Sequence, residues 1–237
     1  MSTTQHSGPS DFDPYAQNYD AALAQGLAAS GEGRDYFAQG RIAWLAGQLR
    51  PCARPPASVL DFGCGTGATV PLLLDLLGAR SVVGVEASTS TLEVARRNYG
   101  SERTRFLTLQ QFEPVAEIDL AYCNGVFHHI PPQERAAALQ LVFRALRPGG
   151  WFAFWENNPW NPGTRYIMRR IPFDRDAIPI TPPEARQMLM QEGFEIQRTD
   201  FLFIFPRLLR GLRFLEPWLA AYPLGGQYQV LCRKPQP

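Results

Sequence analysis

A glycine-rich segment carries the clearest chemistry in the sequence. Residues 59–67 read Val-Leu-Asp-Phe-Gly-Cys-Gly-Thr-Gly. Glycines let a backbone turn sharply from a strand into a helix, and the N–H groups at the helix start attract ligand oxygens. Gly63, Gly65 and Ala68 also fit the G-x-G-x-x-G/A pattern of dinucleotide sites, and Glu86, roughly 20 residues on, is placed to hold a ribose. The turn therefore predicts an adenosine-containing ligand, but it fits both a nicotinamide cofactor and S-adenosylmethionine.

Three features favour S-adenosylmethionine. Asp61 lies two residues before the first glycine, within reach of an ammonium group, which the methionine part of this cofactor has and a dinucleotide lacks. Gly67 extends the pattern to G-x-G-x-G and leaves space for a nucleoside close to the loop. The remaining chain also lacks the long second half expected of a dehydrogenase. A glycine turn with no ligand is the structural alternative.

Polar residues at the ends of two later apolar runs are candidates for catalysis. His128 and His129 follow the run 118–123. Histidine titrates near neutrality, so one of them could serve as a general base. Adjacent side chains point apart, so at most one should face a ligand, and His128 is favoured; the alternative is that the pair packs against the cofactor loop. Glu156 follows the run 151–155 and could be a base, a partner for a substrate amine or an ion-pair partner of nearby arginines.

The segment after Glu156 predicts a wall that recognises the acceptor. Asn157 and Trp160 supply an amide and an indole. Arg165 and Arg169 are four residues apart, so on a helix they share a face that could clamp a carboxylate or phosphate. A solvated surface is the alternative for this pair. A later run, 201–205, precedes several arginines and fits either a strand and capping helix or an interfacial segment at a membrane.

These residues need a sheet to bring them together. Short apolar runs alternate with segments of helical periodicity, which predicts an α/β fold, a Rossmann-like three-layer sandwich with a mostly parallel sheet. We expect a flexible tail over residues 1–14 and one domain over 15–237, with lid helices at about 15–50 and an acceptor-site insertion at about 157–183. The predicted strands are 58–62, 81–85, 105–109, 118–123, 151–155, 193–205 and 228–232, and the predicted helices are 35–49, 69–77, 88–99, 131–146, 184–192 and 208–221.

Composition excludes several classes of function. The chain of 237 residues has a formal net charge of +1, which gives no basic surface for nucleic acid. Its four cysteines are widely spaced with no C-x-x-C pair, so no metal site is predicted from them. The first residues are polar and no apolar stretch approaches the ~18 residues of a membrane span. We therefore expect a cytoplasmic protein without integral membrane association.

Four segments together resemble the class I S-adenosylmethionine-dependent methyltransferases. They are residues 59–67, 83–86 (Val-Gly-Val-Glu), 119–130 (Asp-Leu-Ala-Tyr-Cys-Asn-Gly-Val-Phe-His-His-Ile) and 146–151 (Leu-Arg-Pro-Gly-Gly-Trp). The resemblance implies a seven-stranded sheet with an antiparallel last strand. It also implies S-adenosyl-L-methionine as cofactor, S-adenosyl-L-homocysteine as product and a small molecule as the acceptor, methylated at oxygen, nitrogen or carbon. Two alternatives remain, a non-catalytic S-adenosylmethionine-binding module and a nicotinamide-dependent oxidoreductase.

The same resemblance assigns the cofactor contacts. The three glycines back the cofactor, Glu86 takes the ribose hydroxyls, and an N-terminal lid segment contributes a tyrosine. Where the family often has an acidic residue for the adenine amine this chain has two glutamines, either of which could accept the same hydrogen bond. A monomer or a homodimer is expected. The cofactor-binding residues implied are Tyr19, Asp61, Gly63, Gly65, Gly67, Glu86, Gln110, Gln111 and Asn124.

Overall fold

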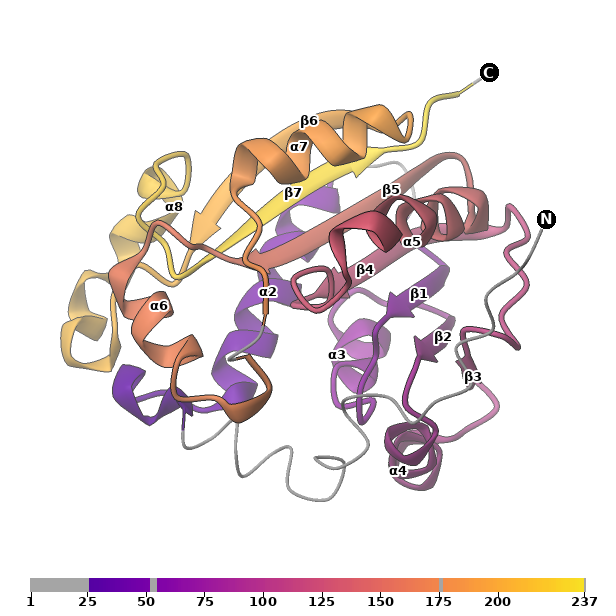
Figure 1. Ribbon diagram of the computed structural model, residues 1–237, viewed down its shortest axis with the longest axis horizontal. Coiled ribbons are helices and arrows are strands. Elements are labelled where there is room, and N and C mark those ends of the chain that lie inside the picture. The colour runs from indigo at the N-terminus through magenta and orange to yellow at the C-terminus, as the bar shows by residue number, and fades with distance from the viewer. Residues whose placement is uncertain (1–25, 52–54, 175–176, 237) are drawn as a thin grey trace.

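One twisted sheet forms the middle layer of the molecule (Figure 1). The computed structural model describes residues 26–51, 55–174 and 177–236, and within them the strand order is β3-β2-β1-β4-β5-β7-β6. Strand β7 runs antiparallel to both of its neighbours, whereas β1 to β5 pair in parallel. This confirms the predicted Rossmann-like fold with its antiparallel last strand. The strands are β1 Ser58–Phe62, β2 Ser81–Glu86, β3 Thr104–Thr108, β4 Ile118–Asn124, β5 Leu146–Asn157, β6 Glu195–Leu202 and β7 Gln227–Arg233.

Helices cover both faces of the sheet. Helices α2, α3 and α4 pack on one face, and α5 and α7 pack on the other. Helix α6 and the short α8 lie beyond the end at which β6 finishes (Figure 1). The α-helices are α2 Arg34–Leu49, α3 Val70–Asp75, α4 Thr89–Tyr99, α5 Pro132–Ala145, α6 Pro162–Met168, α7 Pro182–Gln191 and α8 Glu216–Leu219; three 3-10 segments are η2 Ala28–Ser30, η3 Pro172–Asp174 and η4 Arg207–Leu215.

Strand β1 shows how the two-sided sheet follows from the sequence. Val59 packs with the α2–α4 layer, whereas its neighbour Leu60 packs with the α5–α7 layer. Successive side chains of a strand point to opposite faces, so a central parallel strand must be apolar on both. Helix α4 begins where Ser88 caps it, because the Ser88 hydroxyl accepts a hydrogen bond from the Thr91 N–H.

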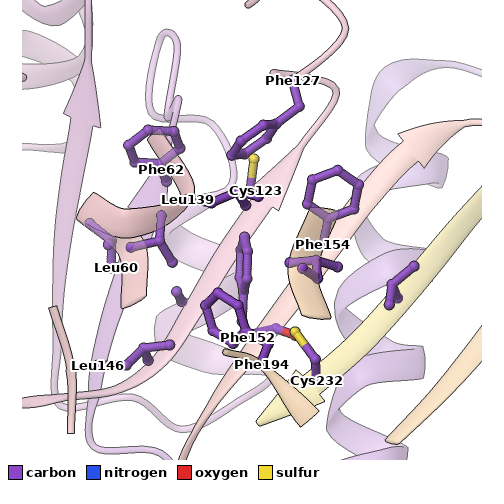
Figure 2. Packing of buried hydrophobic residues seen from close by; sticks show 14 of the residues in the cluster. Leu60, Phe62, Cys123, Phe127, Leu139, Leu146, Phe152, Phe154, Phe194 and Cys232 are labelled. Carbon is purple, nitrogen blue, oxygen red and sulfur yellow. The ribbon is translucent and has the colours of Figure 1, made fainter. Parts of the chain in front are cut away.

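An aromatic cluster fixes the loop that follows β4. Phe127 is fully buried, and its ring lies 6.0 Å from that of Phe62 and 5.1 Å from that of Phe154, measured between centroids. Figure 2 shows Phe127 directly above Cys123, with Phe62 to the left and Phe154 to the right. Since Phe127 is anchored in the core, the residues on either side of it are held at the carboxyl edge of the sheet.

Most elements lie within about two residues of their predicted ends, and three differ more strongly. The strand predicted over 193–205 ends at Leu202, because Phe203 adopts a left-handed conformation with φ of 64°. The helix predicted over 208–221 is a 3-10 segment with a non-helical break at Leu209, followed by the short α8. Strand β5 begins earlier than predicted, at Leu146, and passes through Gly149 at a register irregularity. None of the described helices is long and apolar enough to cross a membrane.

Candidate functional site

The glycine turn connects β1 to the segment before α3 in the predicted way. The N–H groups of Gly63 and Cys64 both donate to the Val85 carbonyl, at 2.8 and 3.1 Å, which ties the turn to β2. Gly63 has a φ of +73°, and a Cβ there would lie 2.2 Å from a methyl carbon of Val126. Only glycine satisfies both the backbone angle and this approach of the β4–α5 loop.

Glu86 joins the turn to the second strand. Its Oε2 accepts a hydrogen bond from the Gly65 N–H at 3.1 Å. Its Oε1 accepts from the N–H groups of Ala87 and Ser88, at 2.8 and 3.1 Å. A carboxylate oxygen can accept more than one hydrogen bond, so these contacts fix the side chain at the end of β2 while leaving it able to accept from a ligand hydroxyl.

The turn and Glu86 border a pocket of about 810 Å³ at the carboxyl edge of the sheet. Gly63, Gly65, Glu86 and Asn124 line it, as the sequence predicted. The rest of its wall comes mainly from β2, the β4–α5 loop and α5, with residues Phe62, Thr66, Val85, Ala87, Thr91, Leu109, Gly125, Val126, His129, Ile130, Pro131, Glu134, Ala137, Ala138 and Leu141. We refer to this space as the cofactor pocket.

Four predicted cofactor residues, Asp61, Gly67, Gln110 and Gln111, are not part of this pocket wall. Gly67 has a φ of +79°, and a Cβ there would lie 3.1 Å from both Phe106 and Ala95, so this glycine allows the turn to pack on the sheet rather than lining the pocket. Gln110 and Gln111 sit in an exposed turn outside the pocket wall, where the Gln111 side chain accepts from the Thr108 N–H. Tyr19 lies outside the described residues.

Asp61 is the strongest indication of a ligand with a positive charge. It is 3% exposed, and its Oδ2 has no hydrogen-bond partner among the described residues. Burial, and then the nearby charge of Glu86, raise the pKa of this carboxyl to about 7, against the opposing charge of Arg41. A buried acceptor without a partner is costly, and an ammonium group would satisfy it. The residue therefore fits the methionine ammonium of S-adenosylmethionine.

Arg41 is a site residue that the sequence interpretation missed. It is 6% exposed, and it donates from Nε to the Tyr122 hydroxyl at 3.0 Å and from Nη1 to the Gln227 side chain at 2.8 Å. Both partners are neutral, although the guanidinium is close enough for its charge to act on Asp61. The sequence does contain an indication of this role. Arg41 lies four residues after Phe37 and four before Leu45, so its cation falls on the apolar face of the predicted helix.

A second pocket, of about 440 Å³, adjoins the first. We call it the acceptor pocket. Asn124, Gly125 and His129 line both pockets, so the two meet at the end of β4. Its walls are supplied by η2, α2, α6, η3 and the segment after β6, and they combine aromatic and aliphatic side chains with polar and charged ones. They include Tyr36, Phe37, Arg41, Asn157, Thr164, Tyr166, Ile167, Met168, Ile171, Phe203, Phe205 and Gln227.

The buried His128 is held between two carboxylates. Its Nδ1 lies 2.5 Å from Glu156 Oε2, and its Nε2 lies 3.6 Å from Asp174 Oδ1. Burial by itself would lower the pKa of His128, but the charges and hydrogen bonds of Glu156 and Asp174 outweigh it and raise the pKa to about 10. Glu156 also accepts from the Phe127 N–H at 2.9 Å. These contacts hold the imidazole in a protonated form, which is unsuited to accepting a proton.

His129 occupies a different environment. Its Nε2 lies 3.3 Å from the same Asp174 oxygen, and its side chain is 16% exposed, toward the two pockets. Burial lowers its pKa, and the neighbouring His128 adds to that effect, although contact with Asp174 opposes them. Of the two histidines, geometry therefore favours His129 over the predicted His128 as the one beside a reacting group.

Several residues predicted to act on the acceptor lie outside both pocket walls. Glu156 is 1% exposed and lines neither pocket, since it bonds His128 and the Phe127 backbone. Trp160 is half exposed and also outside both walls. Arg165 and Arg169 share the outward face of α6, because the inward face is taken by Thr164 and Met168. Of the predicted set, Asn157 does line the acceptor pocket, where its Oδ1 accepts from the Gln227 amide at 3.3 Å.

Comparison with known proteins connects this architecture to a family. A family model described as a methyltransferase domain matches residues 59–150, which contain the glycine turn and the β4–α5 loop. Trans-aconitate 2-methyltransferase from Azoarcus sp. (strain BH72) is 32% identical over 116 residues, which are 49% of this chain and 45% of that protein. The chain spans about half the length of the first curated relatives it matches.

Solved structures extend the similarity to nearly the whole chain. A putative methyltransferase from Haloferax volcanii, in complex with the Trm112 methyltransferase activator, aligns with a TM-score of 0.66 at 18% identity, over 97% of this chain and all of that one. The [4+2]-cyclase SpnF aligns with a TM-score of 0.65 at 16% identity, over 97% and 98%. At these identities the structures support the fold alone. The match of residues 59–150 to a methyltransferase domain, the similarity to trans-aconitate 2-methyltransferases and the glycine turn together support an S-adenosylmethionine-dependent methyltransferase of class I.

Proposed function

We propose that this protein transfers the methyl group of S-adenosylmethionine to a small molecule bound in the acceptor pocket. The observation that carries the proposal is the junction of the two pockets, where Asn124, Gly125 and His129 line both. A methyl donor in one pocket and an acceptor in the other would meet at the end of β4. Orienting the two reactants in this way supplies much of the rate of an in-line displacement.

The proposal assigns the cofactor to residues that are already fixed by the fold. Glu86 would accept from the ribose hydroxyls. Asp61 and Arg41 carry opposite charges near one another without a mutual salt bridge, so they match the ammonium and carboxylate of the methionine part. When bound, S-adenosylmethionine supplies a methyl group on a positively charged sulfur, which is an activated leaving group. The protein then needs to align an acceptor atom and exclude water.

The character of the acceptor pocket indicates the class of acceptor. Phe37 and Phe203 pack edge to face with centroids 4.9 Å apart, and Tyr36 packs against both. At the outer end Arg213 donates to Glu32 at 2.9 Å and lies over the Tyr36 ring. Polar groups also lie at the junction, at Asn124 and His129. We therefore expect an acceptor with an apolar or aromatic body and a heteroatom that points toward His129.

Two pocket-filling variants test the assignment of the pockets. Ile167→Trp should fill the acceptor pocket and abolish turnover while leaving the affinity for S-adenosylhomocysteine within about twofold. Ala138→Trp should fill the cofactor pocket and abolish S-adenosylhomocysteine binding. Affinity is measured by calorimetry. Turnover is measured as S-adenosylhomocysteine release with trans-aconitate and with a panel of phenols, catechols and carboxylic acids. Binding of S-adenosylhomocysteine without turnover on any acceptor would support the non-catalytic binding module instead.

A further inference from the structure

Three potential metal ligands meet on the wall of the acceptor pocket. They belong to His128, His129 and Asp174, which each offer one ligand atom within 4.8 Å of the other two. The Nε2 atom of each histidine faces Asp174 Oδ1. All three residues line the acceptor pocket. We propose that they form a binding site for a divalent first-row transition-metal ion such as Zn²⁺.

The distances fit coordination better than a simple ion pair. A single oxygen, Asp174 Oδ1, faces both imidazoles, at 3.6 Å from His128 and 3.3 Å from His129. A charge-assisted hydrogen bond between such groups would be about 2.7–2.9 Å long. Ligand atoms around a tetrahedral zinc ion, with bonds of roughly 2.0–2.2 Å, lie about 3.3–3.6 Å apart. The oxygen therefore lies at the distance from each nitrogen that two ligands of a common ion would have.

The surroundings of His128 match those of a metal-bound histidine. Glu156 lies 2.5 Å from Nδ1, so this nitrogen is the donor to the carboxylate. Nε2 faces Asp174, and a bound metal ion would replace the proton that Nε2 carries in the metal-free protein. Glu156 is itself held by the Phe127 N–H. Metal-ligating histidines commonly donate their second ring N–H to a carboxylate that fixes the tautomer and the ring orientation. This gives buried Glu156 a role as a positioning residue.

The backbone brings Asp174 to the histidines from far along the sequence. The Ile178 N–H donates to the His128 carbonyl at 2.8 Å, four residues after Asp174. Arg135 clamps the same two segments, since it donates from Nε to the Ile130 carbonyl at 2.9 Å and from Nη2 to the Ile178 carbonyl at 3.0 Å. The carboxylate is therefore positioned by bonds that do not involve the imidazoles.

The donor set indicates both the ion and its use. Two imidazoles and one carboxylate suit zinc and neighbouring transition ions, whereas magnesium and calcium prefer oxygen ligands. Three protein ligands leave at least one coordination position, and here it opens on the acceptor pocket. If the proposed methyl transfer holds, the ion would bind the heteroatom of the acceptor beside His129, the residue that also borders the cofactor pocket.

Metal titration of the full chain tests the site without any acceptor. After treatment with a chelator, the protein is titrated with ZnCl₂ by calorimetry and with CoCl₂ by visible absorption, which reports the coordination of cobalt. We expect one ion per chain, and at least about a hundredfold weaker binding in His129→Ala and Asp174→Ala. Glu156→Gln should weaken binding by about 10–100-fold, as expected for a group that orients a ligand. Glu32→Gln removes a carboxylate at the outer end of the same pocket and should bind the ion as the unaltered chain does.

Binding of S-adenosylhomocysteine verifies that each variant is folded. The proposal is overturned if the unaltered chain binds no ion, or if both ligand variants bind it as tightly as Glu32→Gln. Metal binding without methyl turnover would leave the site standing and count against the proposed function. If the chain binds no ion and its methyl turnover is unaffected by the chelator, the metal site is contradicted and the proposed function is supported.

Discussion

The cofactor pocket and the acceptor pocket are built in different ways. Around the cofactor pocket, the backbone defines the site: a turn bound to the Val85 carbonyl, a glycine at φ +73° and N–H groups that fix Glu86. Around the acceptor pocket, side chains define the site, and they come from segments far apart in the sequence, such as Phe37, Asp174 and Phe203. A site formed by the backbone of one short segment produces a recognisable spacing of residue types in the sequence. A site formed by side chains from distant segments produces no such local pattern.

The largest effect is expected for replacement of Gly63, which should change the stability of the backbone-defined site. Gly63→Ala should lower the free energy of unfolding by about 2–5 kcal/mol, because a left-handed alanine costs about 1–2 kcal/mol and the clash with Val126 adds about 1–3 kcal/mol. Gly65→Ala is the matched control, since Gly65 has a φ of +52° but a Cβ there would have no neighbouring atom within 4 Å. The free energy of unfolding of Gly65→Ala should fall only by the cost of the left-handed backbone, about 1–2 kcal/mol. Urea denaturation without ligand measures both, and equal losses would contradict the packing role of Gly63.

The same contrast explains how much could be predicted from the sequence. The alternation of strands and helices predicted the sheet, and the glycine spacing identified Gly63, Gly65 and Glu86 as neighbours of one pocket. Arg41 and Phe203 were missed because their roles depend on tertiary packing: a buried cation on α2, and a residue with φ of 64° at the end of β6. The histidine pair was recognised, but Asp174, 45 residues after His129, shares no local pattern with it.

Variants of Asp61 test whether a side chain also contributes to ligand affinity at the cofactor site, which is otherwise formed by the backbone. Its carboxyl has a pKa of about 7 and must be ionised to bind an ammonium group. Affinity for S-adenosylhomocysteine should therefore be full above that pH and fall as the pH drops, approaching about tenfold per pH unit between roughly pH 6.5 and 5.5. Calorimetry over this range measures it.

Asp61→Asn supplies the comparison for that pH profile. It should bind about 10–100-fold more weakly at neutral pH, the loss expected for a hydrogen bond to a charged group, and its affinity should be nearly independent of pH. Asp119→Asn removes a carboxylate from the neighbouring strand, where Asp119 bonds the N–H groups of Ala57 and Ser58. It should keep the pH dependence, and a profile equally steep in Asp61→Asn would assign the titration to another group.

The smallest effect is expected for Arg165 and Arg169, the pair that the sequence suggested as a clamp for the acceptor. Arg165 and Arg169 lie on the outward face of α6, so replacing both with alanine should change the KM for any acceptor that is turned over by less than about twofold. Arg41→Met removes a buried cation of the same type and should weaken S-adenosylhomocysteine binding by at least about tenfold, because the methionine carboxylate loses its partner. A large rise in KM for the double variant would mean that the acceptor extends over α6.

The arginine pair satisfied the spacing rule of a helix, but spacing fixes only which residues share a face. The packing of Thr164 and Met168 decides which face is inside.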